Sequence, residues 1–225
     1  MSVKLAVFDV DGTLVDSREI ILRAAREASA DVGLPEPTYD EVRKVVGLSL
    51  SAALQRLAPQ LSEAELAEFV GRYQASFLRM HATPGFHEPL YDGAEETLQR
   101  LKREGWTIAM ATGKSRRGVE RWMAREGWAD IFTSTHCADD GPGKPDPAML
   151  VAAMKAAGAR PEATIMIGDT DHDMRMAVNA RTRPQGVAWA FQTAEEIRAA
   201  GAAHVAHDFD ELNAELDAFA VRAFA

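Results

Sequence analysis

The stretch from Leu5 to Ser17, LAVFDVDGTLVDS, constrains the fold and the chemistry of this chain most strongly. Four apolar residues, Leu5 to Phe8, predict a buried strand, and the carboxylates of Asp9 and Asp11 follow directly. Residues two apart in a strand point to the same side. A carboxylate at the end of a buried strand is costly unless it is paired or bound to a metal, and two adjacent carboxylates repel each other. We therefore expect a cation beside these two acids.

Beyond residue 90, apolar segments that predict strands alternate with segments that predict helices. The expected strands lie at 106–111, 131–134, 164–167, 186–189 and near Val205. This alternation indicates a parallel sheet covered on both faces, to which the first strand also belongs. The region between residues 18 and 82 predicts helices only. The sequence therefore predicts an α/β fold with two parts.

The first expected part is a Rossmann-like parallel-sheet core, covered by helices and formed by residues 1–16 and 86–225. The second is an all-helical cap of residues 17–85, inserted after the first strand. Because the chain crosses between the two parts twice, the cap can move as a hinged lid over the strand ends.

Several polar residues fall at the carboxyl ends of predicted strands, where open α/β sheets bind their ligands. Besides Asp9 and Asp11, they are Thr112, Gly113, Lys144 in the loop GPGKPDP, Asp169, and Asp173 one helical turn later. This set supplies carboxylate oxygens, a cation, a hydroxyl and backbone N–H groups, which suit Mg2+ and a phosphate group better than zinc. Asp9 is able to attack phosphorus, and Asp11 to protonate the leaving oxygen and then activate water.

Each of these motifs has a simpler explanation when it is taken alone. Asp-Gly and Thr-Gly are common turn pairs, a lone lysine is usually at the surface, and acids such as Asp169 and Asp173 favour helix starts. Their joint occurrence, in order and each at a predicted strand end, favours the functional interpretation.

Four segments, DVDGTLVDS, MATGK, GKPDP and GDTDHD, closely resemble the four motifs of the haloacid dehalogenase (HAD) superfamily of phosphatases. The phosphoglycolate phosphatase-like branch is the most similar. The resemblance implies that Asp9 is the nucleophile and Asp11 the general acid and base. It also implies that Thr112, Gly113 and Lys144 hold the phosphoryl group.

For the metal, the resemblance implies Mg2+ held by the Asp9 carboxylate, the Asp11 backbone carbonyl and Asp169. Asp173 would act near the metal or orient Lys144. The haloalkanoic acid dehalogenases do not keep the second acid of the first motif, so Asp11 favours phosphate chemistry over dehalogenation. The chain departs from the family pattern at Ala180-Arg181, where Ala-Gly is usual, and at Trp189-Ala190, where Trp-Gly is frequent.

We expect Mg2+-dependent hydrolysis of a small phosphate monoester through an aspartyl-phosphate intermediate. A β-phosphoglucomutase-like phosphomutase or an inorganic pyrophosphatase could use the same residues. A non-catalytic binding module is disfavoured because the full set of acids and Lys144 is present. The expected partner is a small phosphorylated metabolite, and the sequence does not indicate an oligomeric state.

Charge and composition exclude other classes of protein. The formal net charge of −9 argues against non-specific nucleic-acid binding, which needs a basic surface. No apolar run approaches membrane-spanning length, and the N-terminus does not resemble a signal peptide. The single cysteine, Cys137, has no internal disulfide partner, which fits a cytoplasmic location.

Two further groups of residues carry weaker expectations. We expect Lys114, Arg116 and Arg117 to form a solvated helix start, with help in binding an anionic substrate as the alternative. His172 is expected to be a partly exposed residue in the first turn of a helix instead of a metal ligand. Four residues of the helical insertion lie near a helix end that could face the site and select the substrate: Arg43, Lys44, Gly47 and Leu48.

Overall fold

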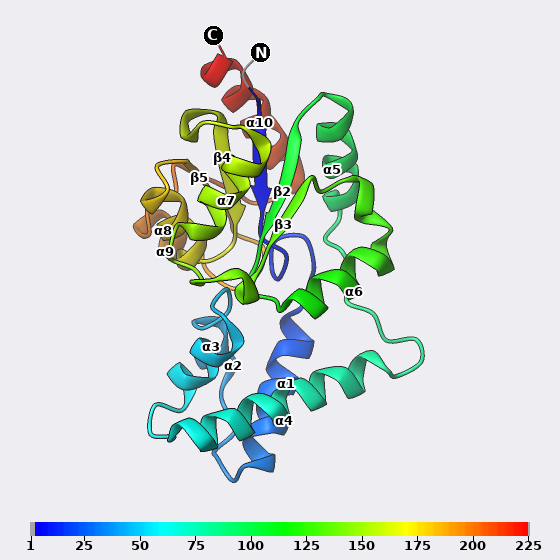
Figure 1. The fold of residues 1–225 in the computed structure, drawn as a ribbon, viewed down its shortest axis with the longest axis vertical. Helices are drawn as coiled ribbons and strands as arrows, with labels where there is room; N and C mark the ends of the chain where they lie inside the picture. Colours follow the sequence, from blue (N-terminus) through cyan, green and yellow to red (C-terminus); the bar gives the residue numbers. More distant parts are fainter. Residues whose placement is uncertain (1–2, 225) are drawn as a thin grey trace.

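The computed structural model describes residues 3–224 and contains a six-stranded parallel sheet with the strand order β3-β2-β1-β4-β5-β6 (Figure 1). The strands are β1 (Leu5–Phe8), β2 (Thr107–Ala111), β3 (Ser134–His136), β4 (Thr164–Gly168), β5 (Arg183–Val187) and β6 (His204–Ala206). The predicted α/β fold with a Rossmann-like parallel sheet is confirmed. Because β1 lies between β2 and β4, the residues that follow β1 sit at the middle of the sheet edge.

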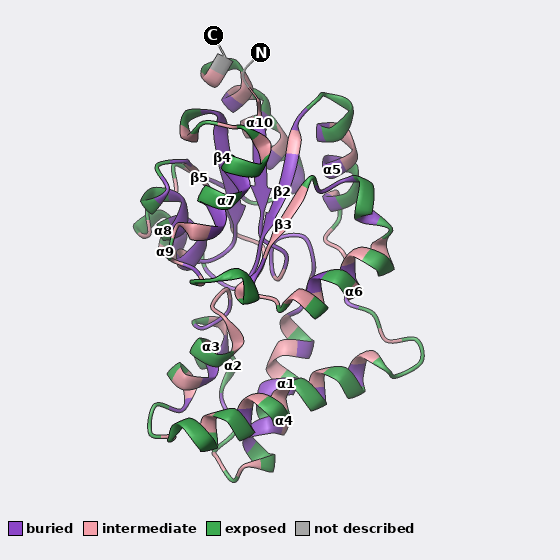
Figure 2. Ribbon diagram, viewed as in Figure 1, coloured by how far each residue is buried: buried purple, intermediate pink, exposed green. Residues whose placement is uncertain are grey.

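Helices cover both faces of the sheet. They are α5 (Ala94–Arg103), α6 (Arg116–Glu126), α7 (Ala148–Ala157), α8 (Asp171–Asn179), α9 (Ala194–Ala199) and α10 (Phe209–Phe224). Ala6 and Phe8 of β1 pack in one core with α5, α6 and α10, whereas Leu5 and Val7 pack in a second core with α7 and α8. This alternation follows from the two-residue period of a strand. It buries β1 along its whole length (Figure 2), which explains why all four of its residues are apolar.

Two strand positions differ from the sequence prediction. β3 begins at Ser134, because Ile131 and Phe132 pack with Trp128 in the core instead of joining the sheet. β5 begins at Arg183, three residues before the apolar run, because its pairing with β4 starts at Ile165↔Arg183. In both cases tertiary packing and strand register override local hydrophobicity.

The departure at Arg181 from the family pattern has a structural correlate. Arg181 has a φ of 58°, in the left-handed region that glycine adopts without steric cost. It follows Ala180, the C-cap residue of α8, and its backbone N–H donates to the carbonyl of Val178 at 3.0 Å. The chain therefore makes the usual glycine turn with an arginine.

The helices between β1 and α5 form a separate group beyond the carboxyl ends of the strands (Figure 1). They are α1 (Arg18–Asp31), α2 (Tyr39–Arg43), α3 (Leu50–Leu57) and α4 (Glu63–His81). We call residues 17–85 the helical segment. Its outgoing and returning connections lie side by side, since Val15 bridges Leu90 and Asp16 N donates to Pro89 O at 2.9 Å. No helix of residues 3–224 is long and apolar enough to cross a bilayer.

Candidate active site

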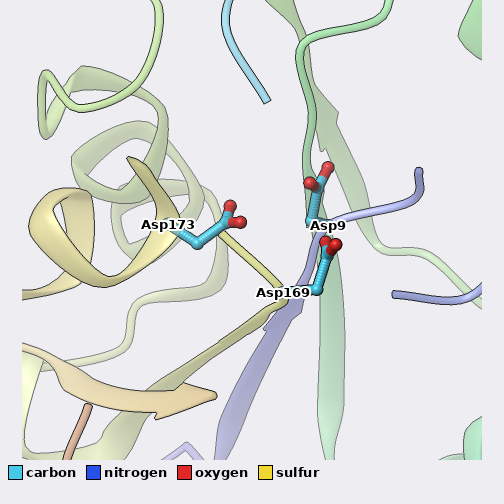
Figure 3. Close-up of side chains that lie close together, drawn as sticks. All are labelled: Asp9, Asp169 and Asp173. Carbon is cyan, nitrogen blue, oxygen red and sulfur yellow. The ribbon is translucent and has the colours of Figure 1, made fainter. Parts of the chain in front are cut away.

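Three buried carboxylates meet at the carboxyl ends of β1 and β4. Asp9 follows β1, Asp169 follows β4, and Asp173 lies in the first turn of α8. Because β1 and β4 are parallel neighbours, their ends bring oxygens of these three side chains within 4.8 Å of one another (Figure 3). A cluster of carboxylate oxygens at this spacing suits a hard divalent cation such as Mg2+ or Ca2+.

The ammonium group of Lys144 lies among these three carboxylates. Its fully buried Nζ lies 2.8 Å from Asp9 Oδ2 and 2.6 Å from Asp173 Oδ1. Asp173 is held in turn through its other oxygen, Oδ2, which accepts from Thr170 Oγ1 at 2.6 Å and from Thr170 N at 3.1 Å. Of the two roles expected for Asp173, near the metal or orienting Lys144, its contact with Lys144 fits the second.

The charges in this cluster do not balance when all three acids are ionised, because Lys144 is the one cation among the described residues in contact with them. Burial raises the pKa of Asp9 to about 7, with Lys144 acting in the opposite direction and Asp173 adding to the increase. Burial, together with Asp173 and Asp9, also holds the pKa of Asp169 well above its usual range. Asp9 Oδ1 is buried and has no hydrogen-bond partner among residues 3–224. The residues present therefore fit a divalent cation on charge, on donor chemistry and on spacing.

The loop after β1 wraps around Asp169. Thr13 Oγ1 donates to Asp169 Oδ1 at 3.2 Å, and Phe191 N donates to Asp169 Oδ2 at 3.2 Å. Gly12 has a φ of 81°, and a Cβ at this position would lie 2.3 Å from Asp169 Oδ2. Glycine is thus required at position 12 for two reasons, the left-handed turn and the close approach to a buried carboxylate.

Asp11 is paired with Lys114, which the sequence analysis expected to be solvated. Lys114 Nζ lies 2.7 Å from Asp11 Oδ1, and the Lys114 side chain is only 11% exposed. The expectation was wrong for Lys114, because the residue lies between β2 and α6, where the strand end faces β1. Arg117 is exposed, and Arg116 forms an ion pair with Asp140. Lys114 directly follows Thr112-Gly113 at the end of a predicted strand, and this position could have identified it as a residue of the site.

Thr112 and Gly113 connect this site to the helical segment. Thr112 is buried, and its Oγ1 accepts from Lys114 N at 3.3 Å. A Cβ at Gly113 would lie 2.5 Å from the carbonyl oxygen of Leu48 and 3.0 Å from that of Gly47. Glycine at position 113 therefore lets the backbone of the helical segment rest directly on the strand-end loop.

Replacing Gly113 with alanine is expected to lower kcat/KM by about tenfold to 100-fold, because backbone atoms must shift next to the site. Steady-state kinetics on any hydrolysed phosphate ester measures the loss. Gly71→Ala in α4 is the matched control, since a Cβ at Gly71 meets nothing within 4 Å. Equal kcat/KM values for the two variants would contradict the role assigned to this contact.

A cavity of about 680 Å³ lies between the helical segment and the sheet edge, and Asp9, Asp11 and Lys114 line it. Of the four candidate selection residues, Gly47 and Leu48 line this cavity, whereas Arg43 and Lys44 are not among the lining residues. Lys44 instead pairs with Asp40.

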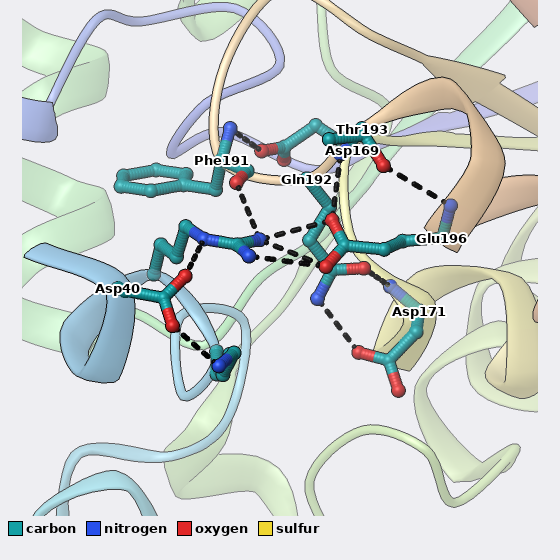
Figure 4. A network of polar contacts seen from close by, with 9 residues as sticks. Asp40, Asp169, Asp171, Phe191, Gln192, Thr193 and Glu196 are labelled. Atoms are coloured by element: carbon teal, nitrogen blue, oxygen red, sulfur yellow. Dashed lines mark hydrogen bonds and ion pairs between the residues drawn. The ribbon is translucent and has the colours of Figure 1, made fainter.

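Arg43 joins the helical segment to the core outside the cavity. Its Nη1 lies 2.9 Å from Glu196 Oε2 and 3.4 Å from the carbonyl oxygen of Phe191 (Figure 4). Because Phe191 N also donates to Asp169, a single residue contacts both the helical segment and the acidic cluster.

His172 is buried, with 4% of its surface exposed, and not partly exposed as expected. A Cβ at Gly47 would lie 3.7 Å from the His172 ring, so the helical segment covers this first turn of α8. The sequence of α8 alone carried no sign of this cover.

Comparisons with known proteins agree with the geometry. The model of the family described as haloacid dehalogenase-like hydrolase matches residues 6–187. A protein of Dickeya dadantii named "Probable phosphatase IndB" is 33% identical over 210 residues, which cover 92% of this chain and 91% of that protein. A phosphoglycolate phosphatase of Vibrio vulnificus is 32% identical over 218 residues, with 93% and 94% covered. The solved structure of a hydrolase from Pseudomonas syringae superposes with a TM-score of 0.83 at 25% identity, covering 96% of this chain and 98% of that one.

Proposed function

Because this chain belongs to the haloacid dehalogenase-like hydrolase family, we propose that it is a Mg2+-dependent phosphatase that hydrolyses phosphate monoesters through an aspartyl-phosphate on Asp9. The observation that carries the proposal is the buried contact of Lys144 with both Asp9 and Asp173, beside Asp169. A carboxylate nucleophile, an ammonium for phosphoryl oxygens and a set of oxygen ligands are thereby gathered at one point.

In the first half-reaction, a carboxylate oxygen of Asp9 attacks phosphorus, and the bond from phosphorus to the ester oxygen breaks. Asp11, two residues further and lining the same cavity, gives its proton to the departing oxygen. Lys144, Thr112 and the Gly113 backbone N–H hold the phosphoryl oxygens, whose charge they offset.

In the second half-reaction, Asp11 accepts a proton from a water molecule, whose oxygen attacks the phosphorus of the aspartyl-phosphate. The bond between phosphorus and Asp9 breaks, which returns the Asp9 carboxylate and releases inorganic phosphate. Lys114, 2.7 Å from Asp11, positions the Asp11 carboxylate for both proton transfers.

Mg2+ would be held by the carboxylates of Asp9 and Asp169 and by the backbone carbonyl of Asp11, with Asp173 close by. When bound, it neutralises the excess of negative charge in the cluster and polarises the phosphoryl group. Support comes from the spacing of the three carboxylates and from the raised pKa values of Asp9 and Asp169.

We also propose that residues 17–85 are a cap domain and that residues 1–16 and 86–225 are the catalytic core. Two side-by-side connections near Val15 and Leu90 join them, which suits a hinge. Support comes from the contacts of the segment with the core, which join Leu48 to Gly113 and Arg43 to Glu196. A closed cap of this kind excludes water other than the attacking molecule during phosphoryl transfer.

The products of the reaction distinguish a phosphatase from a phosphomutase. With Mg2+ and a panel of phosphorylated metabolites, including sugar phosphates, we expect inorganic phosphate and the free alcohol in equal amounts. Phosphate assay and chromatography of the alcohol measure both. An isomeric phosphate ester without free phosphate would contradict the proposal and support the phosphomutase. Phosphate release from pyrophosphate at a higher kcat/KM than from any ester would support a pyrophosphatase.

A further inference from the structure

The side of the cavity formed by the helical segment is mostly apolar. Apolar and aromatic side chains from α1, α3, α4 and the α2–α3 connection line it, among them Ile21, Val46, Leu54, Val70, Tyr73 and Phe77. The polar side chains of the segment that line it are Ser49, Ser51, Gln74 and His81. Asp9, Asp11, Gly113 and Lys114 line the opposite side, on the sheet edge. A phosphate at Asp9 therefore has its ester group directed toward a hydrocarbon wall.

This wall offers no cation to an acidic leaving group. Among the described residues of the helical segment that line the cavity, none is lysine or arginine. His81 is the remaining basic side chain there, and burial together with Lys114 and Arg121 lowers its pKa to about 4, so it is neutral near pH 7. A leaving group with its own carboxylate or phosphate would lose hydration against this wall without gaining a partner.

The cations that line the cavity belong to the core side. Lys114 is paired with Asp11, and Arg125 contacts Glu88 and Glu126. Arg117 and Arg121 also line the cavity, and they share a face of α6 because they lie four residues apart. These two arginines raise the potential on the core side, where the phosphate dianion enters.

The cavity is larger than a small acidic leaving group needs. Its volume is about 680 Å³. Pockets that enclose drug-sized ligands measure roughly 300–1,000 Å³, and their walls are mostly apolar with a few polar groups. A two-carbon acid or a second phosphate group would leave most of the apolar wall in contact with water. A hydrocarbon group that covers the wall gains from its burial.

We propose that the substrate is a phosphate monoester with a bulky, predominantly apolar leaving group. The phosphate lies at Asp9 and Lys144, and the hydrocarbon part contacts α1, α3 and α4. This inference rests on the proposed phosphatase function and adds the chemical class of its substrate.

A series of straight-chain alkyl phosphates from ethyl to octyl tests the inference, because the leaving-group chemistry stays nearly constant while the hydrocarbon grows. We expect kcat/KM, measured with Mg2+ by phosphate release, to rise by up to about fourfold for each added methylene until the cavity is filled. The kcat/KM for octyl phosphate is expected to exceed the values for phosphoglycolate and for pyrophosphate. A flat or falling series, or a higher kcat/KM for either of those two compounds, would overturn the inference.

A variant of the wall provides an independent readout. Val46→Thr keeps the shape of the side chain and adds a hydroxyl at the wall, so the octyl-to-ethyl ratio of kcat/KM is expected to fall at least about threefold. Val221→Thr, at a position that is 71% exposed on α10, is the matched control and should leave the ratio unchanged. An unchanged ratio in the Val46 variant would count against contact of the hydrocarbon with this wall.

Failure of the inference and failure of the proposed function give different results. p-Nitrophenyl phosphate, an activated ester, reports phosphatase chemistry with little demand on the leaving group. Hydrolysis of this ester together with a flat alkyl series overturns the inference alone. If Mg2+ supports release of phosphate from no ester, including this one, both the function and the inference are wrong.

Discussion

Asp9→Asn is expected to lower kcat by at least about 10^4-fold, because an amide cannot act as the carboxylate nucleophile toward phosphorus. The change conserves the shape of a side chain that is 1% exposed and removes one charge from a cluster of three carboxylates and one ammonium. Lys144 keeps its contact with Asp173, so the fold should persist. Steady-state hydrolysis of p-nitrophenyl phosphate with Mg2+ measures the effect.

Two controls make this result interpretable. Asp31→Asn, at the exposed end of α1, removes the same charge away from the site and should leave kcat unchanged. Thermal unfolding of Asp9→Asn should occur at or above the wild-type temperature in the absence of metal, since the variant relieves repulsion among buried acids. A rate within tenfold of wild type would remove Asp9 from the role of nucleophile.

Removal of divalent metal is the second change with a large expected effect. EDTA should reduce phosphate release to the background rate, and excess Mg2+ should restore it, because the carboxylates of Asp9 and Asp169 otherwise repel the phosphoryl group. The measurement is phosphate release before chelation, after chelation and after addition of Mg2+. A wild-type rate after dialysis against EDTA would contradict the proposed metal dependence.

The metal effect should depend on pH in a defined direction. In the metal-free protein the pKa of Asp9 is raised to about 7 by burial, so the folded state holds this proton up to near neutrality while the unfolded state loses it near its usual value of 3.8. The metal-free protein therefore loses this part of its stability as pH rises through that window. Mg2+ requires the ionised carboxylate, so its binding strengthens over the same window.

Thermal unfolding with and without Mg2+ tests this linkage. The increase in Tm caused by Mg2+ should be larger at about pH 8 than at about pH 6, and Asp9→Asn should reduce the difference between the two pH values. The opposite order, with the larger increase at lower pH, would show that Asp9 does not have to lose a proton when the metal binds.

The fold was largely predictable because its signals are local. The apolar run of β1 and the break between the helical region and the strand–helix alternation were visible in the sequence. The strands β3 and β5 were misplaced, because their limits depend on pairing with β2 and β4 and on the packing of Ile131 and Phe132. Such contacts join residues that are distant in the chain, and hydrophobic patterns do not record them.

The acidic cluster was predictable for a topological reason, whereas its partners were not. Parallel strands end at one edge, so acids placed after β1 and β4 had to meet. Lys114 was missed because a basic residue at the start of a helix is usually solvated, and only the fold brings it to Asp11. The same limit applied to Arg43, which was expected near the substrate and instead pairs with Glu196.

The covalent intermediate on Asp9 is the most direct test of the account. The enzyme is quenched in acid during turnover, reduced with borohydride and digested, and the peptide that contains Leu5 to Ser17 is analysed by mass spectrometry. Reduction of an aspartyl-phosphate converts that aspartate to homoserine. The account predicts homoserine at position 9, dependent on both substrate and Mg2+. Homoserine at another position, or an unmodified peptide from an enzyme trapped during steady turnover, would contradict it.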